Sequence, residues 1–295
     1  MGADEVLATY PRSLSPSRAN DFLTCPLLFR YRSIDRLPEP GSPAALRGTL
    51  VHSALETLFD LPPGDRTVAA AADLLQSAWM AMAEQEPAAA AVLLDELGLA
   101  ADSEPASVAS AVLQPARPLL ETYFRMEDPR RLEPHARELG LRVGLTGDFD
   151  LRGVIDRVDR APNGDIRIVD YKTGRSPRAG YESKAMFQMR FYALAWWRMT
   201  GNVPKLLQLI YLGSGDMLRY VPTEDDLVAT ERKVLAVREA INRAAITADF
   251  TPNPSKLCGW CAHQPVCPQF GGTPPLLPDP ALWPTTSRAD EEAVG

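Results

Sequence analysis

Two acidic residues and a lysine lie within an apolar pattern that predicts a β-hairpin. Runs rich in Val and Ile flank Asn163-Gly164, a dipeptide typical of tight turns. Asp156 lies within the first run and Asp170 near the end of the second, where burial is expected. A buried carboxylate is costly unless a cation or strong hydrogen-bond donors satisfy it. Because side chains alternate along a strand, Lys172 shares a face with Asp170.

This hairpin admits two interpretations. One is a divalent-cation site with an amine held beside it. The other is a set of ordinary ion pairs, such as Asp156 beside Arg157 at a solvated strand edge. The residues of the hairpin alone favour the two interpretations about equally.

The four cysteines of the chain predict a metal centre. Cys258, Cys261 and Cys267 follow the spacing C-x2-C-x5-C among Gly and Pro residues, and the fourth cysteine is Cys25. Cys25 and Cys267 each precede a proline, as some iron–sulfur ligands do. Zinc is the main alternative, with His263 as a possible substitute ligand. Four unrelated buried cysteines are the third and weakest interpretation.

Composition is that of a globular protein. The 295 residues are 45% hydrophobic and 23% charged, enough for one large domain or two small ones. No apolar run reaches the roughly 20 residues of a membrane span, and no signal-peptide pattern is present, so we expect a cytoplasmic location and no membrane partner. The net charge of −7 is concentrated in residues 61–110, whereas residues 152–190 are basic and compatible with nucleic acid.

The elements that must position these residues follow from periodicity. The pattern predicts strands over 139–145, 149–158 and 166–171, and a second hairpin over 206–212 and 217–221. It predicts helices over 15–25, 44–59, 183–200 and 224–248, with Pro26 beginning a new helical piece. This order indicates an α/β fold with a mixed central sheet.

The chain divides into five predicted regions. They are an N-terminal helical segment (1–60), an Ala-rich acidic helical insertion or lid (61–135), a core (136–250), a cysteine block (251–270) and a Pro-rich disordered tail (271–295). In the first region, arginines alternate with aromatic residues. That pattern suits single-stranded nucleic acid, but an amphipathic helix with aromatics inward and arginines outward is the favoured interpretation.

The order of the motifs resembles the RecB-type exonuclease branch of the PD-(D/E)XK nuclease superfamily. The motifs are Gly48-x3-His52, Gly153-x2-Asp156-Arg-x-Asp159, Asp170-Tyr-Lys172-Thr-Gly and Gln188-x3-Tyr192. The terminal cysteines, with Leu14-Ser-Pro-Ser, Phe22 and Cys25-Pro, resemble the iron–sulfur subgroup of CRISPR-adaptation and AddAB-type nucleases. The resemblance implies a restriction-endonuclease-like α/β core with a mixed sheet flanked by helices, a helical insertion and an iron–sulfur staple.

The resemblance also implies a role for each matching residue. His52, Asp156, Asp170 and the Tyr171 carbonyl would bind Mg²⁺ or Mn²⁺, with the histidine favouring Mn²⁺. Lys172 would orient or activate the attacking water. Gln188 and Tyr192 would support the site or contact the DNA backbone. Cys25, Cys258, Cys261 and Cys267 would hold a 4Fe-4S cluster, or zinc in the alternative.

Together these features predict a metal-dependent DNA exonuclease acting on single-stranded ends in repair, recombination or defence. The chain has no G-x4-G-K-[ST] phosphate loop, so we expect no ATP-driven helicase activity of its own, although a helicase or repair partner fits the family. The alternative is a non-catalytic, iron–sulfur-stapled DNA-binding subunit beside a helicase. A zinc-bound scaffold is a weaker alternative.

Overall fold

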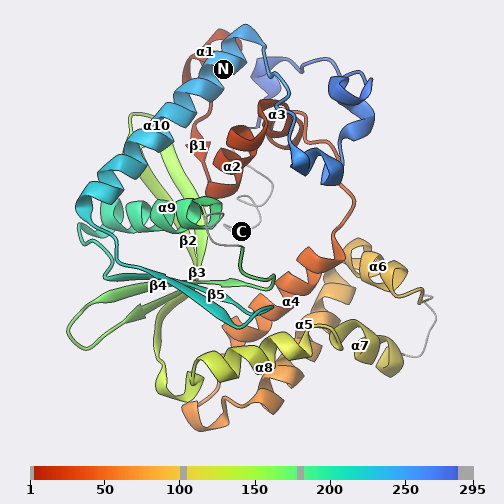
Figure 1. Ribbon diagram of the computed structural model, residues 1–295, viewed down its shortest axis with the longest axis vertical. Coiled ribbons are helices and arrows are strands. Elements are labelled where there is room, and N and C mark those ends of the chain that lie inside the picture. Colours follow the sequence, from red (N-terminus) through yellow and green to blue (C-terminus); the bar gives the residue numbers. More distant parts are fainter. Residues whose placement is uncertain (1–2, 100–104, 178–182, 285–295) are drawn as a thin grey trace.

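The structure is a computed structural model that describes residues 3–99, 105–177 and 183–284. A mixed six-stranded sheet with helices on both faces forms its centre, which confirms the predicted α/β fold (Figure 1). The strands are β1 (Ser13–Leu14), β2 (Pro134–Thr146), β3 (Phe149–Arg160), β4 (Ile166–Lys172), β5 (Leu206–Tyr211) and β6 (Asp216–Tyr220). In the described ranges, no helix is both long and apolar enough to cross a membrane.

Strand β3 pairs with two strands along its first edge and with one strand along its second edge. Along the second edge, β2 pairs antiparallel with β3 over nearly its whole length. The first edge pairs with β1 at Asp150 and Leu151, in parallel, and with β4 from Arg157 to Arg160, antiparallel. Residues 152–156 lie between these pairings, and on this edge no described strand bonds to them. The predicted site residues gather at this gap.

Both predicted hairpins are present. Gly164 has a φ of +88° in the turn between β3 and β4, a conformation that glycine adopts without steric cost. The side-chain oxygen of Asn163 accepts the backbone N–H of Asp165 at 3.1 Å in the same turn. Strands β5 and β6 pair antiparallel, and helix α9 (Ser183–Thr200) connects β4 to β5, which therefore run parallel.

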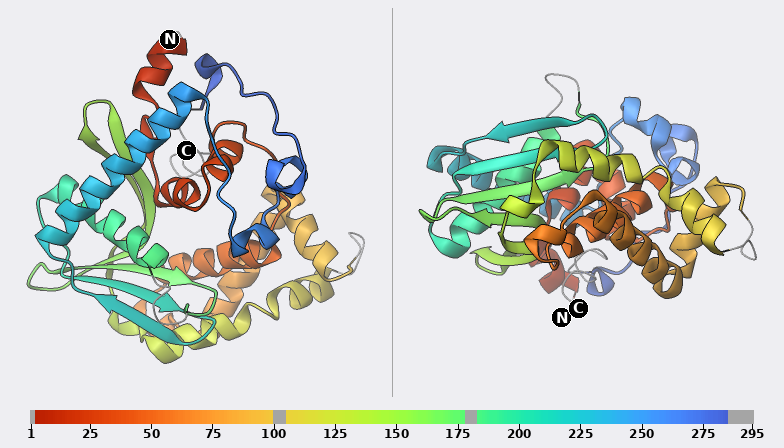
Figure 2. Two further views of the ribbon diagram at one scale, coloured as in Figure 1. Left: turned by 45° about the horizontal axis from the view of Figure 1, so that its top comes forward. Right: turned by 90° about the horizontal axis from the view of Figure 1, so that it is seen from below.

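Two layers of helices cover the two faces of the sheet. Helices α9 and α10 (Glu224–Thr247) pack on one face with α2 (Pro16–Thr24) and α3 (Pro26–Ser33), and α1 (Ala3–Thr9) lies against α10. The other face is covered by α4 (Pro43–Leu58), α5 (Val68–Gln85), α6 (Pro87–Glu96), α7 (Pro105–Leu113) and α8 (Arg117–Met126). Figures 1 and 2 show the two layers on either side of the sheet. The predicted insertion therefore shares a hydrophobic core with the sheet through Val169 and Tyr171.

Local signals in the sequence account for where these helices begin. Ser15 caps α2 through its side chain, and Pro26 begins α3 after an extended Cys25, as predicted. Ser42 caps α4 in the same way. Thr223 and Asp226 form a reciprocal capping box at the start of α10.

The prediction of a disordered tail over 271–295 is wrong for residues 271–284. Trp283 is only 5% exposed, and its ring lies 5.0 Å from that of Tyr10 in an edge-to-face arrangement. Its indole N–H donates to the Pro278 carbonyl at 2.9 Å, and Arg30 donates to the Pro275 carbonyl. Buried Trp283 thus anchors a segment whose proline content otherwise indicates disorder. Residues 285–295 lie outside the described residues.

Gly153 allows a tyrosine of α9 to approach β3 closely. A Cβ atom at this position would come within 2.8 Å of Tyr192 Cε1. Gly153→Ala should therefore reduce the free energy of unfolding by about 1–3 kcal/mol, the usual cost of overpacking. Urea denaturation of the purified protein measures this change.

Gly144→Ala is the matched control, because Gly144 lies on neighbouring β2 and a Cβ there would be 3.9 Å from the nearest atom, Asp150 Oδ1. The free energy of unfolding of this variant should equal that of the parent or exceed it by about 0.4–1 kcal/mol. Equal destabilisation by the two substitutions would show that the contact with Tyr192 is not responsible.

Candidate active site

The carboxylate of Asp156 lies where β3 and β4 separate. The last paired residues before the separation are Arg157 and Val169. Beyond them, Asp156 Oδ2 accepts the backbone N–H of Tyr171 at 2.7 Å and so replaces a strand partner. Burial, and then the charge of Asp170, raises the pKa of Asp156 well above its usual range, and the Tyr171 N–H opposes this. A cation beside the carboxylate would remove much of that cost.

Helix α4 brings His52 to this carboxylate. His52 Nδ1 lies 3.5 Å from Asp156 Oδ2. Gly48, one helical turn earlier, permits this approach, because a Cβ there would lie 3.3 Å from Thr173 Oγ1 at the end of β4. Burial lowers the pKa of His52, and the nearby Asp170 charge only partly offsets this. The imidazole is therefore neutral near pH 7, the form that binds metal ions.

Asp170, Lys172 and two residues of α9 form a connected polar chain. Asp170 is 2% exposed, and its Oδ2 lies 2.7 Å from Lys172 Nζ. Lys172 Nζ donates to Gln188 Oε1 at 2.9 Å, and Gln188 Nε2 donates to Asp170 Oδ1 at 3.1 Å. Gln188 Nε2 also lies 3.0 Å from the hydroxyl of Tyr192. The i, i+4 spacing of α9 thus places both side chains behind the Asp170–Lys172 pair.

Sequence analysis does not predict Glu138, which lies beside His52 and Asp156. Ligand atoms of these three residues all lie within 4.8 Å of one another. The β2–β3 register places Glu138 opposite Asp156, and its φ of +40° is unusual for a residue other than glycine. The available signal was the antiparallel pairing of two predicted strands about Gly147, which sets residue 138 against residue 156. Burial, and then neighbouring carboxylates, raises the pKa of Glu138 to about 7.

These donors fit a divalent cation. One imidazole and at least two carboxylates converge, and the main chain of Tyr171 hydrogen-bonds His52. A cavity of about 490 Å³, lined by one side of α4 with Thr173 and Glu138, opens beside them. Oxygen ligands suit Mg²⁺ or Mn²⁺, and the imidazole favours Mn²⁺.

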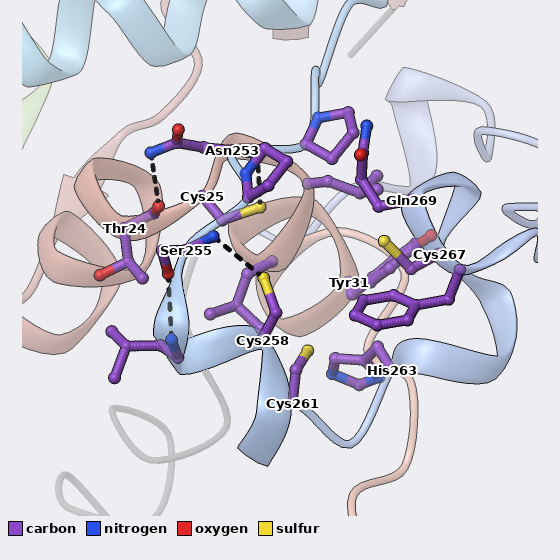
Figure 3. A pocket seen from close by; sticks show the side chains of 16 residues that line it. Thr24, Cys25, Tyr31, Asn253, Ser255, Cys258, Cys261, His263, Cys267 and Gln269 are labelled. Atoms are coloured by element: carbon purple, nitrogen blue, oxygen red, sulfur yellow. Dashed lines mark hydrogen bonds between the residues drawn. The ribbon is translucent and has the colours of Figure 1, made fainter.

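The four cysteines come together although Cys25 is far from the others in sequence. Figure 3 shows their side chains around one cavity of about 60 Å³, between the start of α3 and the C-terminal segment. Two sulfurs accept backbone N–H groups: Cys25 from Asn253 at 3.4 Å, and Cys258 from Ser255 at 3.3 Å. Donors aimed at sulfur stabilise thiolate charge, so the site suits a metal centre.

His263 also lines this cavity, but one ring nitrogen is already engaged. Its Nε2 lies 2.7 Å from Glu39 Oε1, and its ring packs edge-to-face on Tyr31. Burial, and then the charge of Cys267, raises the pKa of Tyr31 to about 12, so its phenol is neutral. The Tyr31 hydroxyl donates to the Val266 carbonyl at 2.7 Å, which ties α3 to the cysteine segment.

Two arginines of the N-terminal helices are internal to the fold, whereas Arg32 is exposed. The aromatic residues point inward as predicted, but the outward orientation predicted for the arginines is wrong for Arg18 and Arg30, which are buried. Arg18 donates to the Ser13 carbonyl at 2.9 Å, and Arg30 pairs with Asp35 at 3.0 Å. Arg18 also donates to the hydroxyls of Ser33 and Tyr10, so these guanidinium groups bind within the fold, which the sequence pattern alone does not reveal.

A nuclease family model and a phage protein match parts of this chain. The family model of the PD-(D/E)XK nuclease superfamily matches residues 13–268. Gene 69 protein of Mycobacterium phage L5 is 35% identical over 137 residues, which cover 45% of this chain and 44% of that protein. The chain thus matches less than half of that relative.

Two crystal structures are also similar. One, named "Putative exonuclease", is from Eubacterium rectale; it is 13% identical, has a TM-score of 0.49, and the match covers 87% of this chain and 90% of the other. The other, SSO0001, is 13% identical with a TM-score of 0.39, over 90% and 94% of the chains. The family match spans both the acidic site and the cysteines, and the chain belongs to the PD-(D/E)XK nuclease superfamily.

Proposed function

We propose that the protein is a divalent-metal-dependent DNA exonuclease that acts on single-stranded ends in repair, recombination or defence. The observation that carries the proposal is the Asp170–Lys172–Gln188 chain at the end of β4, next to Asp156, Glu138 and His52. Within the superfamily, we assign the chain to the RecB-type exonuclease branch and its iron–sulfur subgroup. A helicase or repair protein is the expected partner.

His52, Glu138, Asp156 and Asp170 would hold the cation, with the Tyr171 carbonyl as a further ligand. A bound Mg²⁺ or Mn²⁺ lowers the pKa of a water molecule and offsets charge on the scissile phosphate. Gln188 holds Lys172 and Asp170 together, and Tyr192 holds Gln188. The convergence of His52, Glu138 and Asp156 next to the Asp170–Lys172 pair supports catalysis over a purely DNA-binding subunit.

Lys172 serves as a charged donor. Burial lowers the pKa of Lys172, but the charge and hydrogen bond of Asp170 outweigh burial, and the net shift is upward. The amine is therefore protonated at neutral pH. It is suited to orient the attacking water and to offset negative charge on the phosphate in the transition state.

The cysteine site would hold a 4Fe-4S cluster. A tetrahedral zinc ion with zinc–sulfur bonds of about 2.3 Å brings sulfurs to roughly 3.8 Å of one another. Among the described residues, which include all four cysteines, no three of these sulfurs lie within 4.8 Å of one another. A cluster places each thiolate on a different iron and so spaces them more widely. The spacing therefore favours the cluster over zinc.

Asp170→Ala should abolish cleavage of 5′- and 3′-labelled single-stranded DNA with either Mg²⁺ or Mn²⁺. The substitution removes a cation ligand and the partner of Lys172. The fold should persist, because the charge of Asp170 also raises the pKa of Asp156 and so opposes the apo state. Asp165→Ala, in the exposed turn of the same hairpin, is the control. Cleavage by Asp170→Ala at the parental rate would remove Asp170 from the metal site.

Lys172→Ala should lower kcat by roughly 100-fold or more, the scale for losing one electrostatic or proton-transfer group. The dissociation constant for DNA, measured in Ca²⁺ by fluorescence anisotropy, should barely change. Lys205→Ala is the control, because Lys205 precedes the opposite end of the β4–β5 pair. A loss confined to DNA affinity would make Lys172 a phosphate-binding residue.

Cys25→Ala should bleach the protein and loosen both ends of the chain. Parent protein purified without oxygen should be brown, with about four irons per chain. A link from Cys25 to Cys258 closes a loop of about 230 residues, for which the chain-entropy model predicts roughly 5 kcal/mol of stabilisation. Without it, residues 1–40 should become sensitive to limited proteolysis.

His263→Ala should keep the four irons, because Glu39 already binds the histidine. A colourless parent with one zinc would exclude the cluster but keep the link between the two segments. Parental colour and protease resistance in Cys25→Ala would exclude the link.

A further inference from the structure

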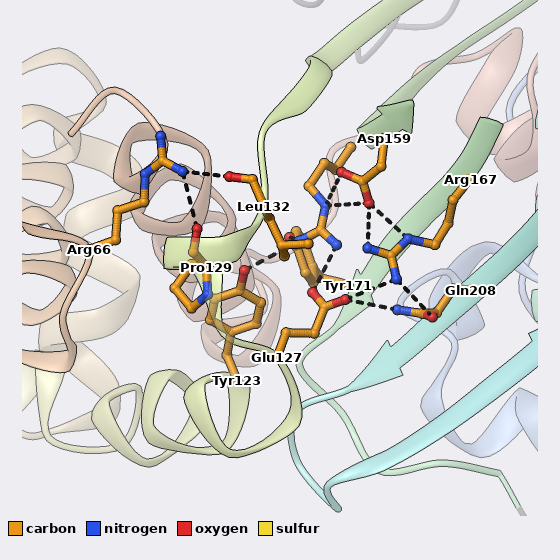
Figure 4. Close-up of polar contacts among 10 residues, drawn as sticks. Arg66, Tyr123, Glu127, Pro129, Leu132, Asp159, Arg167, Tyr171 and Gln208 are labelled. Carbon is orange, nitrogen blue, oxygen red and sulfur yellow. Dashed lines mark hydrogen bonds and ion pairs between the residues drawn. The ribbon is translucent and has the colours of Figure 1, made fainter. Parts of the chain in front are cut away.

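A buried charge network lies on the face of the sheet that α8 covers (Figure 4). At its centre is Arg157, which is 1% exposed. Its Nη2 lies 2.8 Å from Glu127 Oε2, and its Nε lies 3.1 Å from Asp159 Oδ1. Its Nη1 donates to the hydroxyl of Tyr171 and, at 3.3 Å, to that of Tyr123. All three guanidinium nitrogens of Arg157 therefore have partners.

Strand alternation connects this network to the active site. Asp156 and Arg157 are adjacent on β3 and point to opposite faces, as Asp170 and Tyr171 do on β4. Tyr171 contacts both sides at once. Its backbone N–H holds Asp156, while its phenol oxygen accepts a hydrogen bond from Arg157. Asp156 and Arg157 therefore hold Tyr171 from opposite faces of the sheet.

Glu127 completes the network from the helical layer. It directly follows α8, within the segment of residues 61–135, and its side chain is 7% exposed. Besides Arg157, its carboxylate accepts a hydrogen bond from Gln208 Nε2 at 3.1 Å and lies 3.5 Å from Arg167 Nη1. Arg167 in turn pairs with Asp159 at 2.7 Å. Buried Arg157 and half-buried Arg167 thus depend on two acids, and removing either acid leaves an uncompensated charge.

We propose that Glu127 is a positioning residue, which fixes the Asp156 carboxylate for cation binding through Arg157 and Tyr171. The proposal rests on the divalent-cation site of the proposed function. Groups that contact a metal ligand orient it, and the loss of one costs about 10–100-fold in metal affinity or activity. Glu127 acts through Arg157 and Tyr171, so we expect its loss to lie at the lower end of that range. Residues 61–135 then have a role in the chemistry, because they supply the acid that sets the cation affinity.

The test measures Mn²⁺ binding by the full chain without DNA, from the electron paramagnetic resonance signal of free Mn²⁺. Glu127→Gln removes the charge and keeps the shape, and Tyr171→Phe removes one oxygen and keeps the main chain. Both variants should bind Mn²⁺ about 10–100-fold more weakly. In cleavage assays the loss should appear as a higher Mn²⁺ requirement, with kcat recovering as Mn²⁺ approaches saturation. Glu127→Asp, which keeps the charge, should restore part of the affinity.

Arg66→Lys is the matched control. Arg66 is a buried arginine that anchors the same helical segment, through the Leu61 and Leu132 carbonyls at 2.9 and 2.6 Å. It forms none of the hydrogen bonds of Arg157 and Tyr171 described above. Arg66→Lys should lower the melting temperature and leave the Mn²⁺ dissociation constant unchanged.

Tyr171→Phe decides the question alone if Glu127→Gln does not fold. Folded variants with parental Mn²⁺ affinity, whatever their melting temperatures, would show that the network only stabilises the fold. A parent that binds Mn²⁺ and cuts DNA beside such variants refutes the role of Glu127 and leaves the nuclease proposal intact. A parent that does neither refutes the proposed function and this role with it.

Discussion

The hydrogen bond from the Tyr171 amide to Asp156 determines how the site can be built. It forms because β3 and β4 stop pairing after Arg157 and Val169, so a side chain takes the place of a strand. The gap that results must be closed by helices. The absence of a side chain at Gly48 and Gly153 lets α4 and α9 approach closely enough to close it.

The acids at this gap oppose folding when no cation is present, and the rest of the molecule supplies the compensating stability. Burial, and then the charge of neighbouring carboxylates, raises the pKa values of Asp156 and Glu138, so the apo protein offsets part of this cost by holding protons. Two hydrophobic clusters, one on each face of the sheet, hold the strands that carry these acids. Cation binding then releases protons, which couples metal affinity to pH.

Sequence alone predicts the parts of this fold that are local. The Asn163-Gly164 turn, the alternation of β3 and β4 and the period of α9 depend on neighbouring residues, and the structure contains them all. The sequence does not predict contacts between residues that are far apart in the chain. β1 has only two residues and no pattern of its own, and the contacts of Glu127 and Trp283 come from chain segments far away. Glu138 is an intermediate case, because the predicted strands place it beside Asp156 only once their register is known.

The contact between α2–α3 and the cysteine segment has a consequence for synthesis on the ribosome. Thr24 and Tyr31 bind Asn253 and Val266 through hydrogen bonds of 3.0 and 2.7 Å. At about 5–20 residues per second, the second partner of each bond emerges roughly 10–50 seconds after the first. During that interval the nascent chain carries Cys25 as a lone thiol on an undocked helix pair. Helices α2 and α3 are therefore synthesised well before the segment that docks against them.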